Sequence, residues 1–346
     1  MSSSRKSYQE SLACAVVDTG RCFACGACAI VCPFNCIDLK QEKPALVKEC
    51  QECGICAMAC PEYERSSSQM EKYVFGRQRK SDEKFGIFKQ VATVQATDNT
   101  VLRVSQDGGF VTTLLLHALD RGFIDGAIVS GIAENPPFLP YPKLVFSREE
   151  ILQSAGTRYF YSANVLALPM TAGKAKALAF VGTPCQIRAI RKMQASGLKK
   201  HVANIKLLIG LMCSECFTYD GLMKELQEKL GIRPAEIRKI NIKGKMLITT
   251  EKETKLLSLA EAKRYSRKSC EFCQDFSSEF ADISAGGLGL DRWTLAIIRT
   301  AVGQGLYLKV LEAGMLRVKE TPEHVLDLLC KLSARKAKGF CEENMG

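Results

Sequence analysis

Short apolar runs, separated by glycine turns and by longer apolar segments, fill residues 86–346. Short runs of this kind predict buried strands, and the longer segments predict helices. Four prolines within 135–142 argue against a helix or a central strand there. The predicted strands are 91–97, 124–131, 177–181, 205–211 and 294–299, and the predicted helices are 110–119, 303–313 and one that begins near Pro322. Such alternation is typical of a mixed α/β domain.

One cysteine spacing occurs twice before this region. Each copy reads C-x2-C-x2-C-x3-C-P, and this run is typical of proteins with two [4Fe–4S] clusters, in which the fourth ligand of each cluster comes from the other copy. Zinc ribbons use pairs of C-x2-C, and disulfides suit short secreted chains, so both fit less well. The predicted ligands are Cys22, Cys25, Cys28 and Cys60 for one cluster, and Cys50, Cys53, Cys56 and Cys32 for the other.

Residues 1–62 differ from the rest of the chain in their pattern. They predict a short strand near 13–17, a helix after the first cysteine loop, a turn over 35–38 and a strand near 45–47. The charged segment 63–85, which contains three consecutive serines, predicts a linker with a helical piece. We therefore predict an α+β, ferredoxin-like domain at 1–62, a linker at 63–85 and an α/β domain at 86–346.

Composition indicates a soluble globular protein from a reducing compartment. The chain has 346 residues, of which 47% are hydrophobic and 25% are charged. Its apolar runs are shorter than the roughly 18 residues that a membrane helix requires. Its 17 cysteines suit a cytoplasm in which thiolates stay reduced. We expect a cytoplasmic protein that works alone or docked on the cytoplasmic side of a membrane complex.

Most of the positive charge lies outside the cysteine-rich segment. Residues 1–80 hold 11 of the 48 Lys and Arg and 9 of the 37 Asp and Glu, so +9 of the net charge of +11 belongs to residues 81–346. Nucleic-acid binding is disfavoured, because no recognition-helix, zinc-finger or aromatic RNA-binding motif is present. An anionic small ligand or a solvated basic surface accounts for this charge.

Further cysteines follow the predicted strands of the α/β domain. Cys185 comes after strand 177–181, Cys213 and Cys216 come after strand 205–211, and a C-x2-C pair follows at 270 and 273. Strand ends are where open α/β sheets bind ligands. The cysteines allow a third metal site, either a cluster or zinc, with Cys216 as the alternative to Cys213. The others are interpreted as packing or surface residues, namely Cys14, Cys36, Cys330 and Cys341.

Several motifs of the α/β domain occur together. They are Ser105 to Gly109, Gly122 to Ala127, Gly182 to Gln186, Gly210 to Cys213, the pair Cys270 and Cys273 with Asp275 and Phe276, and Ala281 to Ser284. In combination they resemble the beta subunits of coenzyme F420 hydrogenases and the F420-oxidising dehydrogenase subunits. The resemblance covers about residues 86–320. With a ferredoxin-like segment in front, the chain is most similar to the electron-input subunit of the archaeal F420H2 dehydrogenase complex.

The resemblance implies one FAD and a third [4Fe–4S] cluster, with Cys185, Cys213, Cys270 and Cys273 as the cluster ligands. A glycine turn that opens a helix and a strand that ends in small residues suit the phosphates of a flavin nucleotide. The predicted FAD contacts are Ser105, Gly108, Gly109, Ser130, Gly131, Thr157, Arg158 and Thr183. The predicted contacts to the acidic tail of coenzyme F420 are Arg188, Arg191, Lys263, Arg264, Arg267 and Lys268.

The expected chemistry joins a two-electron donor to one-electron carriers. Reduced coenzyme F420 donates a hydride, and clusters carry single electrons. A flavin can accept a hydride and release its two electrons one at a time. We expect F420 oxidation by hydride transfer to FAD and electron flow through three clusters to a partner subunit or a soluble acceptor, without an acid–base side chain. One alternative is a related flavin enzyme that uses ferredoxin or NAD(P)H, although no G-x-G-x-x-G motif follows a strand. The other is an electron-transfer subunit without its own substrate site.

Overall fold

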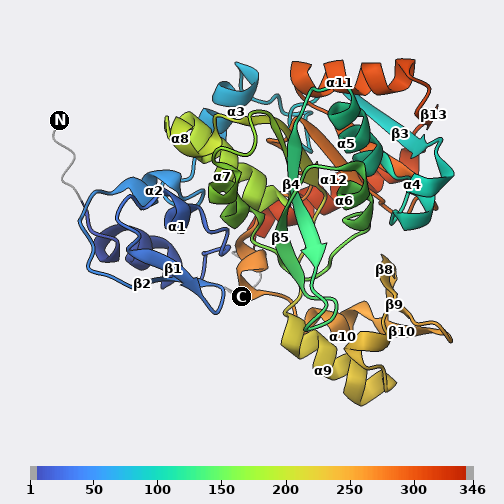
Figure 1. Ribbon diagram of the computed structural model, residues 1–346, viewed down its shortest axis with the longest axis horizontal. Coiled ribbons are helices and arrows are strands. Elements are labelled where there is room, and N and C mark those ends of the chain that lie inside the picture. The colour runs from blue at the N-terminus through green and yellow to red at the C-terminus, as the bar shows by residue number, and fades with distance from the viewer. Residues whose placement is uncertain (1–5, 340–346) are drawn as a thin grey trace.

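The larger part of the chain is built around an eight-stranded mixed sheet (Figure 1). The structure is a computed structural model that describes residues 6–339. Strands β4, β6, β7 and β11 are parallel, and antiparallel strands complete both sides. The spatial order is β13 (Leu316–Lys319), β3 (Gln90–Ala96), β12 (Thr294–Ile298), β11 (Ile283–Gly286), β7 (Ile205–Leu211), β6 (Leu178–Gly182), β4 (Gly126–Ile132) and β5 (Pro140–Val145). The predicted mixed α/β fold is confirmed.

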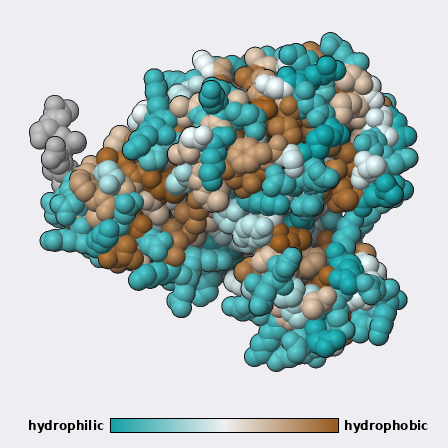
Figure 2. Space-filling view, in the orientation of Figure 1, coloured by the Kyte–Doolittle hydropathy of each residue, from teal (hydrophilic) through white to brown (hydrophobic). Residues whose placement is uncertain are grey.

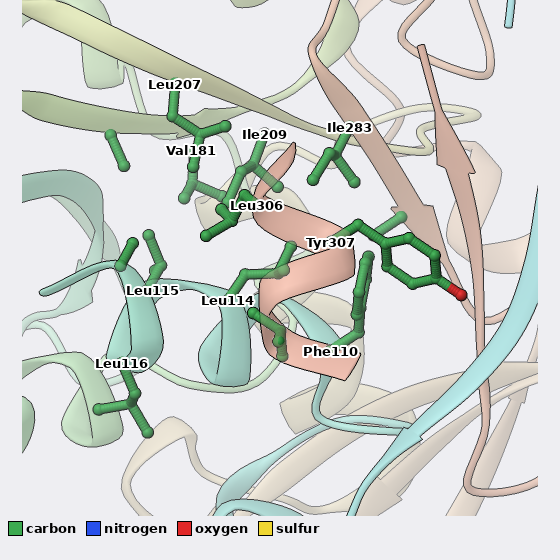
Figure 3. Close-up of a cluster of buried hydrophobic side chains, with 14 of the residues drawn as sticks. Phe110, Leu114, Leu115, Leu116, Val181, Leu207, Ile209, Ile283, Leu306 and Tyr307 are labelled. Atoms are coloured by element: carbon green, nitrogen blue, oxygen red, sulfur yellow. The ribbon is translucent and has the colours of Figure 1, made fainter. Parts of the chain in front are cut away.

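Helices cover both faces of this sheet. On one face, Phe110 and Leu114 of α5 meet Leu306 and Tyr307 of α11 over Ile209 (Figure 3). On the other face, α7 packs with η2 and α8, and α12 packs against β12. The helices are α4 (Asn99–Val104), α5 (Phe110–Asp120), α6 (Arg148–Gln153), η2 (Asn164–Thr171), α7 (Pro184–Ala195), α8 (Lys199–Val202), α11 (Ala301–Glu312) and α12 (Glu323–Lys338).

Local sequence determines where several of these helices begin. Gly109 adopts a φ of 72° immediately before α5, a left-handed conformation that glycine adopts without steric cost. Pro184 is the first residue of α7, where its missing N–H costs nothing. The Ser147 side chain accepts a hydrogen bond from the Glu150 N–H, and the Glu150 side chain accepts one from the Ser147 N–H. This capping box starts α6.

The proline-rich segment 135–142 ends in an edge strand. Pro140 and Pro142 belong to β5, which pairs with β4 and lies at one end of the sheet. An edge strand tolerates proline because one side of the strand needs no ladder hydrogen bonds. The prediction that this segment forms neither a helix nor a central strand is therefore confirmed.

A small N-terminal unit packs beside α7. It consists of η1 (Gln9–Val17), α1 (Ala27–Val31), β1 (Ile37–Lys40), β2 (Lys43–Leu46) and α2 (Ile55–Ala59). Its Ala27, Val31 and Ala59 share one hydrophobic cluster with Ile187 and Ile190 of α7. The unit is drawn in blue in Figure 1, directly beside the larger part. It is therefore joined to the larger part by a common core.

The strand predicted near 13–17 is wrong, because residues Gln9–Val17 form the helix η1. Leu12, Ala13 and Val16 are buried at helical spacing and pack over Cys28 and Cys60. A short apolar run does not by itself distinguish a strand from a helix, and here packing on the cysteine loops decides between them.

The segment 63–85 is attached to the larger part along much of its length. It contains α3 (Ser67–Phe75), which packs on α7. Beyond α3, the Arg79 guanidinium forms ion pairs with Glu71 and with Glu279 of the larger part. These contacts fix the connection between the N-terminal unit and the sheet.

A lobe that the sequence pattern does not predict projects from the larger part (Figure 2). It contains α9 (Tyr219–Leu230), a three-stranded antiparallel sheet and α10 (Leu259–Lys263) around its own hydrophobic cluster. The strands are β8 (Lys239–Lys243), β9 (Lys245–Thr249) and β10 (Thr254–Ser258). Its surface in Figure 2 is mostly hydrophilic.

Replacing Leu114 by alanine tests the core between α5 and the sheet. Leu114 is fully buried, so the Leu114→Ala variant leaves a cavity, and we expect the free energy of unfolding to fall by about 2–5 kcal/mol. Leu308 on α11 is 44% exposed, and Leu308→Ala serves as the control with an expected change within about 0.5 kcal/mol. Urea denaturation followed by circular dichroism measures both. Equal losses would contradict the packing described here.

Candidate functional site

Four cysteines line a cavity inside the N-terminal unit. Cys22, Cys25, Cys28 and Cys60 border it together with apolar side chains such as Leu12, and we call it the first cavity. Cys28 lies in α1, while Cys60 caps the end of α2, and these two short helices pack on one another. This packing brings the last cysteine of the second motif to the first motif.

The other four motif cysteines line a second cavity. Cys32, Cys50, Cys53 and Cys56 border it, with Cys36 and the exposed ring of Phe34. The two sets are those that the spacing predicts, and their role as cluster ligands remains a prediction. Across residues 6–339, no three His, Cys, Asp or Glu side chains converge closely enough to hold a single metal ion.

Backbone N–H groups donate to cysteine sulfurs in both cavities. The bonds are Ala24 N to Cys22 Sγ (3.4 Å), Cys36 N to Cys32 Sγ (3.2 Å) and Tyr8 N to Cys50 Sγ (3.4 Å). Hydrogen bonds to sulfur favour the thiolate and tune the potential of a cluster that it binds. The main chain is therefore already arranged to support negative charge on these sulfurs.

Burial makes the thiols of the first cavity difficult to ionise. It raises the pKa of Cys25 and Cys28 well above the ordinary value, and the neighbouring Cys60 adds to this effect. It raises the pKa of Cys60 to about 12, and in the second cavity it raises that of Cys56 to about 11. A metal group that binds here must displace the protons and compensate the charge. Four thiols around an apolar cavity fit a [4Fe–4S] cluster in this respect.

A third cysteine group lies where the parallel strands end. Cys185 is the second residue of α7, just after β6, and Cys213 follows β7, while Cys270 and Cys273 lie in and after η4 (Lys268–Phe272). Burial raises the pKa of Cys185, and the thiols of the three other cysteines raise it further. Burial also raises the pKa of Cys270 to about 11. We use the name third cysteine group for these four residues.

Cys216 lies beside this group and next to Cys213. The main-chain N–H of Cys216 donates to Cys270 Sγ at 3.4 Å. A hydrogen bond between the thiols of Cys213 and Cys216 raises the pKa of Cys213, as does burial. Cys216 is 6% exposed and packs on Ala24, which lies between two cysteines of the first motif. Cys213 and Cys216 both lie close to Cys270, so the choice of Cys213 as the fourth member of the group remains a prediction. Cys341, the last of the unassigned cysteines, lies outside the described residues.

The loops at one edge of the sheet gather several of the predicted flavin contacts. The end of β3 and the start of β12 meet there, since Val94 pairs with Thr294, and β11 ends beside them. The Gly108 N–H donates to Thr294 Oγ1 at 3.1 Å, and a Cβ at Gly108 would lie 2.6 Å from the Val94 oxygen. Ser105 donates to the Val101 oxygen. Packing alone thus requires glycine at 108.

Arg158 approaches the same loops from the segment that carries Thr157. Its Nη2 donates to the Ala155 oxygen at 3.0 Å, while its buried Nε has no hydrogen-bond partner within residues 6–339. Burial lowers the pKa of Arg158 to about 10. A Cβ at Gly156 would lie 3.0 Å from Arg158 Nη1 and 3.6 Å from the Val104 oxygen, so the Gly156 turn lies close to both groups. A guanidinium with a free donor suits an anion.

The remaining predicted flavin contacts are engaged with protein groups. Ser130 Oγ donates to Asn164 Oδ1, and Asn164 Nδ2 donates to the Val181 oxygen, so Asn164 ties β4 to β6. A Cβ at Gly131 would collide with the Tyr141 ring, which explains this glycine by packing. Thr183 Oγ1 lies 3.2 Å from Cys185 Sγ. No sequence motif pointed to Asn164.

The six basic residues predicted for the F420 tail do not gather in one place. Arg191 pairs with Asp282 at 2.9 Å, and the buried Arg188 lies over the Phe280 ring. The structure therefore gives these two arginines protein partners, and their contact with the F420 tail remains a prediction.

Arg267 is also buried, and its Nε donates to Glu42 at 2.6 Å. The three others are exposed, and two of them form ion pairs, Lys263 with Glu215 and Arg264 with Glu225, while Lys268 lies at the start of η4. The sequence shows that these residues are charged, but it does not show that the side chains of Arg188, Arg191 and Arg267 are largely removed from solvent.

Two lysines that were not predicted lie over the Ser105 loop. Lys239 Nζ donates to the Ser105 oxygen at 3.4 Å, and Lys243 pairs with Asp291 in the β11–β12 loop. Burial raises the pKa of Asp107 in the same loop, and both lysines oppose this shift. Their positions in β8 could have been suspected from the alternation Lys-Ile-Asn-Ile-Lys.

Family models match most of the chain. The model of the C-terminal part of the coenzyme F420 hydrogenase/dehydrogenase beta subunit matches residues 175–324, and the model of the N-terminal part of the same protein matches residues 91–169. The chain belongs to this family. A 4Fe-4S binding domain model matches residues 15–38. The resemblance that the sequence motifs indicated is therefore confirmed.

Individual relatives extend this result to nearly the whole chain. The beta subunit of the coenzyme F420 hydrogenase of Methanothermobacter thermautotrophicus is 37% identical over 268 residues, which are 75% of this chain and 95% of that relative. A subunit of the F(420)H(2) dehydrogenase of Methanosarcina mazei is 30% identical over 344 residues, which are 94% of this chain and 92% of that relative. A chain of the F420-reducing [NiFe] hydrogenase complex from Methanosarcina barkeri superimposes with a TM-score of 0.71 at 32% identity, covering 75% of this chain and 92% of that one.

Iron content distinguishes Cys213 from Cys216. We expect Cys213→Ser to lower the iron of the anaerobically purified protein by the content of one [4Fe–4S] cluster, because a ligand is lost. We expect Cys216→Ser to keep its iron, as should the control Cys14→Ser on the surface of η1. Iron loss in the Cys216→Ser variant with full iron in Cys213→Ser would reverse the assignment.

Proposed function

We propose that this chain oxidises reduced coenzyme F420 by hydride transfer to FAD and passes the electrons singly through three [4Fe–4S] clusters to a partner protein. The chain is an F420-related oxidoreductase subunit by family, with a 4Fe-4S binding domain. Relatives named for F420 dehydrogenase, F420 hydrogenase and F420-dependent sulfite reductase support coenzyme F420 as the donor.

One observation carries the proposal, namely that the candidate sites form a continuous series. Thr183, one of the predicted flavin contacts, lies 3.2 Å from Cys185 of the third cysteine group. Ala24 of the first cavity packs in one cluster with Cys216, Cys213 and Cys270. Cys28 and Cys56 then share the hydrophobic cluster that separates the first and second cavities. Such a series suits stepwise passage of single electrons.

The residues of the sheet edge have distinct roles in this proposal. A bound flavin would supply the exchange between a hydride and single electrons. Arg158 would hold the negative charge of its pyrophosphate with the free Nε donor, and the start of α5 after Gly109 would add its N–H groups. Lys239 and Lys243 would attract the acidic tail of coenzyme F420 from the projecting lobe, with Lys263, Arg264 and Lys268 as the exposed members of the predicted set.

The electron-accepting partner is proposed to dock at the second cavity. Phe34 borders this cavity and is 50% exposed, and Val47 nearby is 43% exposed. Relatives such as that of the F(420)H(2) dehydrogenase are named as subunits, which supports a multisubunit setting. Among residues 6–339, no helix is both long and apolar enough to cross a membrane.

An anaerobic assay tests the donor. Protein reconstituted with iron, sulfide and FAD is mixed with reduced coenzyme F420 and a one-electron dye, and NADH and NADPH are tested in parallel. We expect rapid oxidation of F420 and no oxidation of the nicotinamides. Activity with NADPH alone would favour a related flavin enzyme with another donor. A protein that binds its clusters but no flavin would instead be an electron-transfer subunit.

Arg158 is tested by its effect on FAD affinity. We expect Arg158→Gln to weaken FAD binding by about tenfold or more, because a charge-assisted hydrogen bond to a phosphate is lost. Arg233→Gln is the control, since Arg233 is exposed and pairs with Glu236 in the lobe. Equilibrium dialysis against FAD measures both variants. Unchanged affinity in Arg158→Gln would remove this residue from the flavin site.

A further inference from the structure

A buried arginine joins the first cavity to the third cysteine group. Arg267 is 6% exposed and lies just before η4, which carries Cys270. Its main-chain N–H donates to the Cys216 oxygen at 2.9 Å, and its own oxygen accepts from the Cys270 N–H at 2.9 Å. The backbone of Arg267 is therefore fixed beside the third cysteine group.

The side chain of the same residue reaches the other site. Arg267 Nη2 donates at 3.3 Å to the oxygen of Phe23, which lies between Cys22 and Cys25 of the first cavity. Its Cζ lies 3.8 Å from the centre of the Tyr161 ring. Tyr161 is 9% exposed and packs with Ala24, so the cation and the ring together fill the space between the two sites.

The counter-ion of this arginine faces water. Glu42 in the β1–β2 turn accepts from Arg267 Nε at 2.6 Å, and its side chain is 50% exposed while that of Arg267 is 6% exposed. Solvent screens the carboxylate more effectively than the buried guanidinium. On the side that faces the cysteines, the positive charge is therefore only partly compensated.

We propose that Arg267 is a positioning residue whose fixed charge raises the reduction potentials of the two clusters on either side of it, in the first cavity and in the third cysteine group. The inference rests on the proposed function in one respect, the assignment of clusters to these cysteines. One electron leaves one cluster and enters the other, and no bond is made and no proton moves. A nearby positive charge favours the reduced, more negative state of each cluster.

The second cavity provides an internal control for this effect. Its lining residues do not include the Phe23 loop that Arg267 contacts. A potential at that cavity should change little, because charge interactions weaken with distance and screening. A general loss of folding would disturb all three sites, whereas the loss of one local charge would affect two.

Potentiometric titration of the full-length chain, reconstituted anaerobically and followed by electron paramagnetic resonance, tests the proposal. For Arg267→Gln we expect the equilibrium constant for one-electron reduction of each flanking cluster to fall by about tenfold. This equals a fall of about 59 mV in the reduction potential of a one-electron couple. Arg267→Lys keeps the charge and should restore most of the shift. Arg238→Gln is the matched control, because Arg238 pairs with the carboxylate of Glu251 on the surface and its loss should change no potential.

Unchanged potentials in Arg267→Gln with full iron content would overturn the proposal. If that variant loses a cluster, Glu42→Gln gives the opposite test: removal of the carboxylate should raise the same two potentials, and no rise would also overturn it. A wild-type chain that holds all clusters but does not oxidise F420 would reject the proposed substrate and leave the role of Arg267 to be decided by these shifts. A wild-type chain without clusters at the two flanking sites would reject the cluster assignment, and the inference with it.

Discussion

The close burial of many thiols is the constraint on which the rest of the structure depends. Burial raises the pKa of Cys25, Cys28 and Cys60, so these residues stay protonated unless a cation compensates their charge. The same N-terminal unit uses Cys28 and Cys60 as part of the core on which η1 rests. Cluster binding and folding of this unit are therefore expected to be coupled, because ligation replaces neutral thiols at the centre of that core.

A second constraint fixes this unit against the larger domain. Gly26 precedes α1 with a φ of 86°, and a Cβ at this position would overlap the Leu166 side chain of η2. Ser196 Oγ also donates to the Met58 oxygen across the same boundary. Contacts this close leave little freedom between the first cavity and the third cysteine group. If both sites hold the proposed clusters, side-chain packing would set the distance between two electron carriers, on which transfer depends steeply.

Sequence reasoning succeeded where the chemistry is local. Cluster motifs place three ligands within seven residues, so spacing alone predicted which cysteines share a cavity. Buried strands such as β6 and β7 were found because their residues are almost all apolar, with Lys206 the exception in β7. The lobe was missed because its short strands alternate lysine with apolar residues and resemble a solvated surface. The helix η1 was missed because its apolar residues match a strand equally well. Arg188 and Arg267 are buried by segments that are far from them in the sequence, so no local sequence pattern predicts this burial.

The proposed clusters change the interpretation of the chain's positive charge. Several arginines compensate internal carboxylates, as Arg79 does with Glu71 and Glu279 and Arg191 does with Asp282. An oxidised [4Fe–4S] core held by four thiolates carries roughly −2, so three proposed clusters would bring about −6 to a chain whose net charge is +11 with neutral cysteines. Each added electron lowers the net charge further. With these clusters, much of the basic excess would balance the charge of the protein's own cofactors, and less of it would remain for an external anion than the sequence alone suggests.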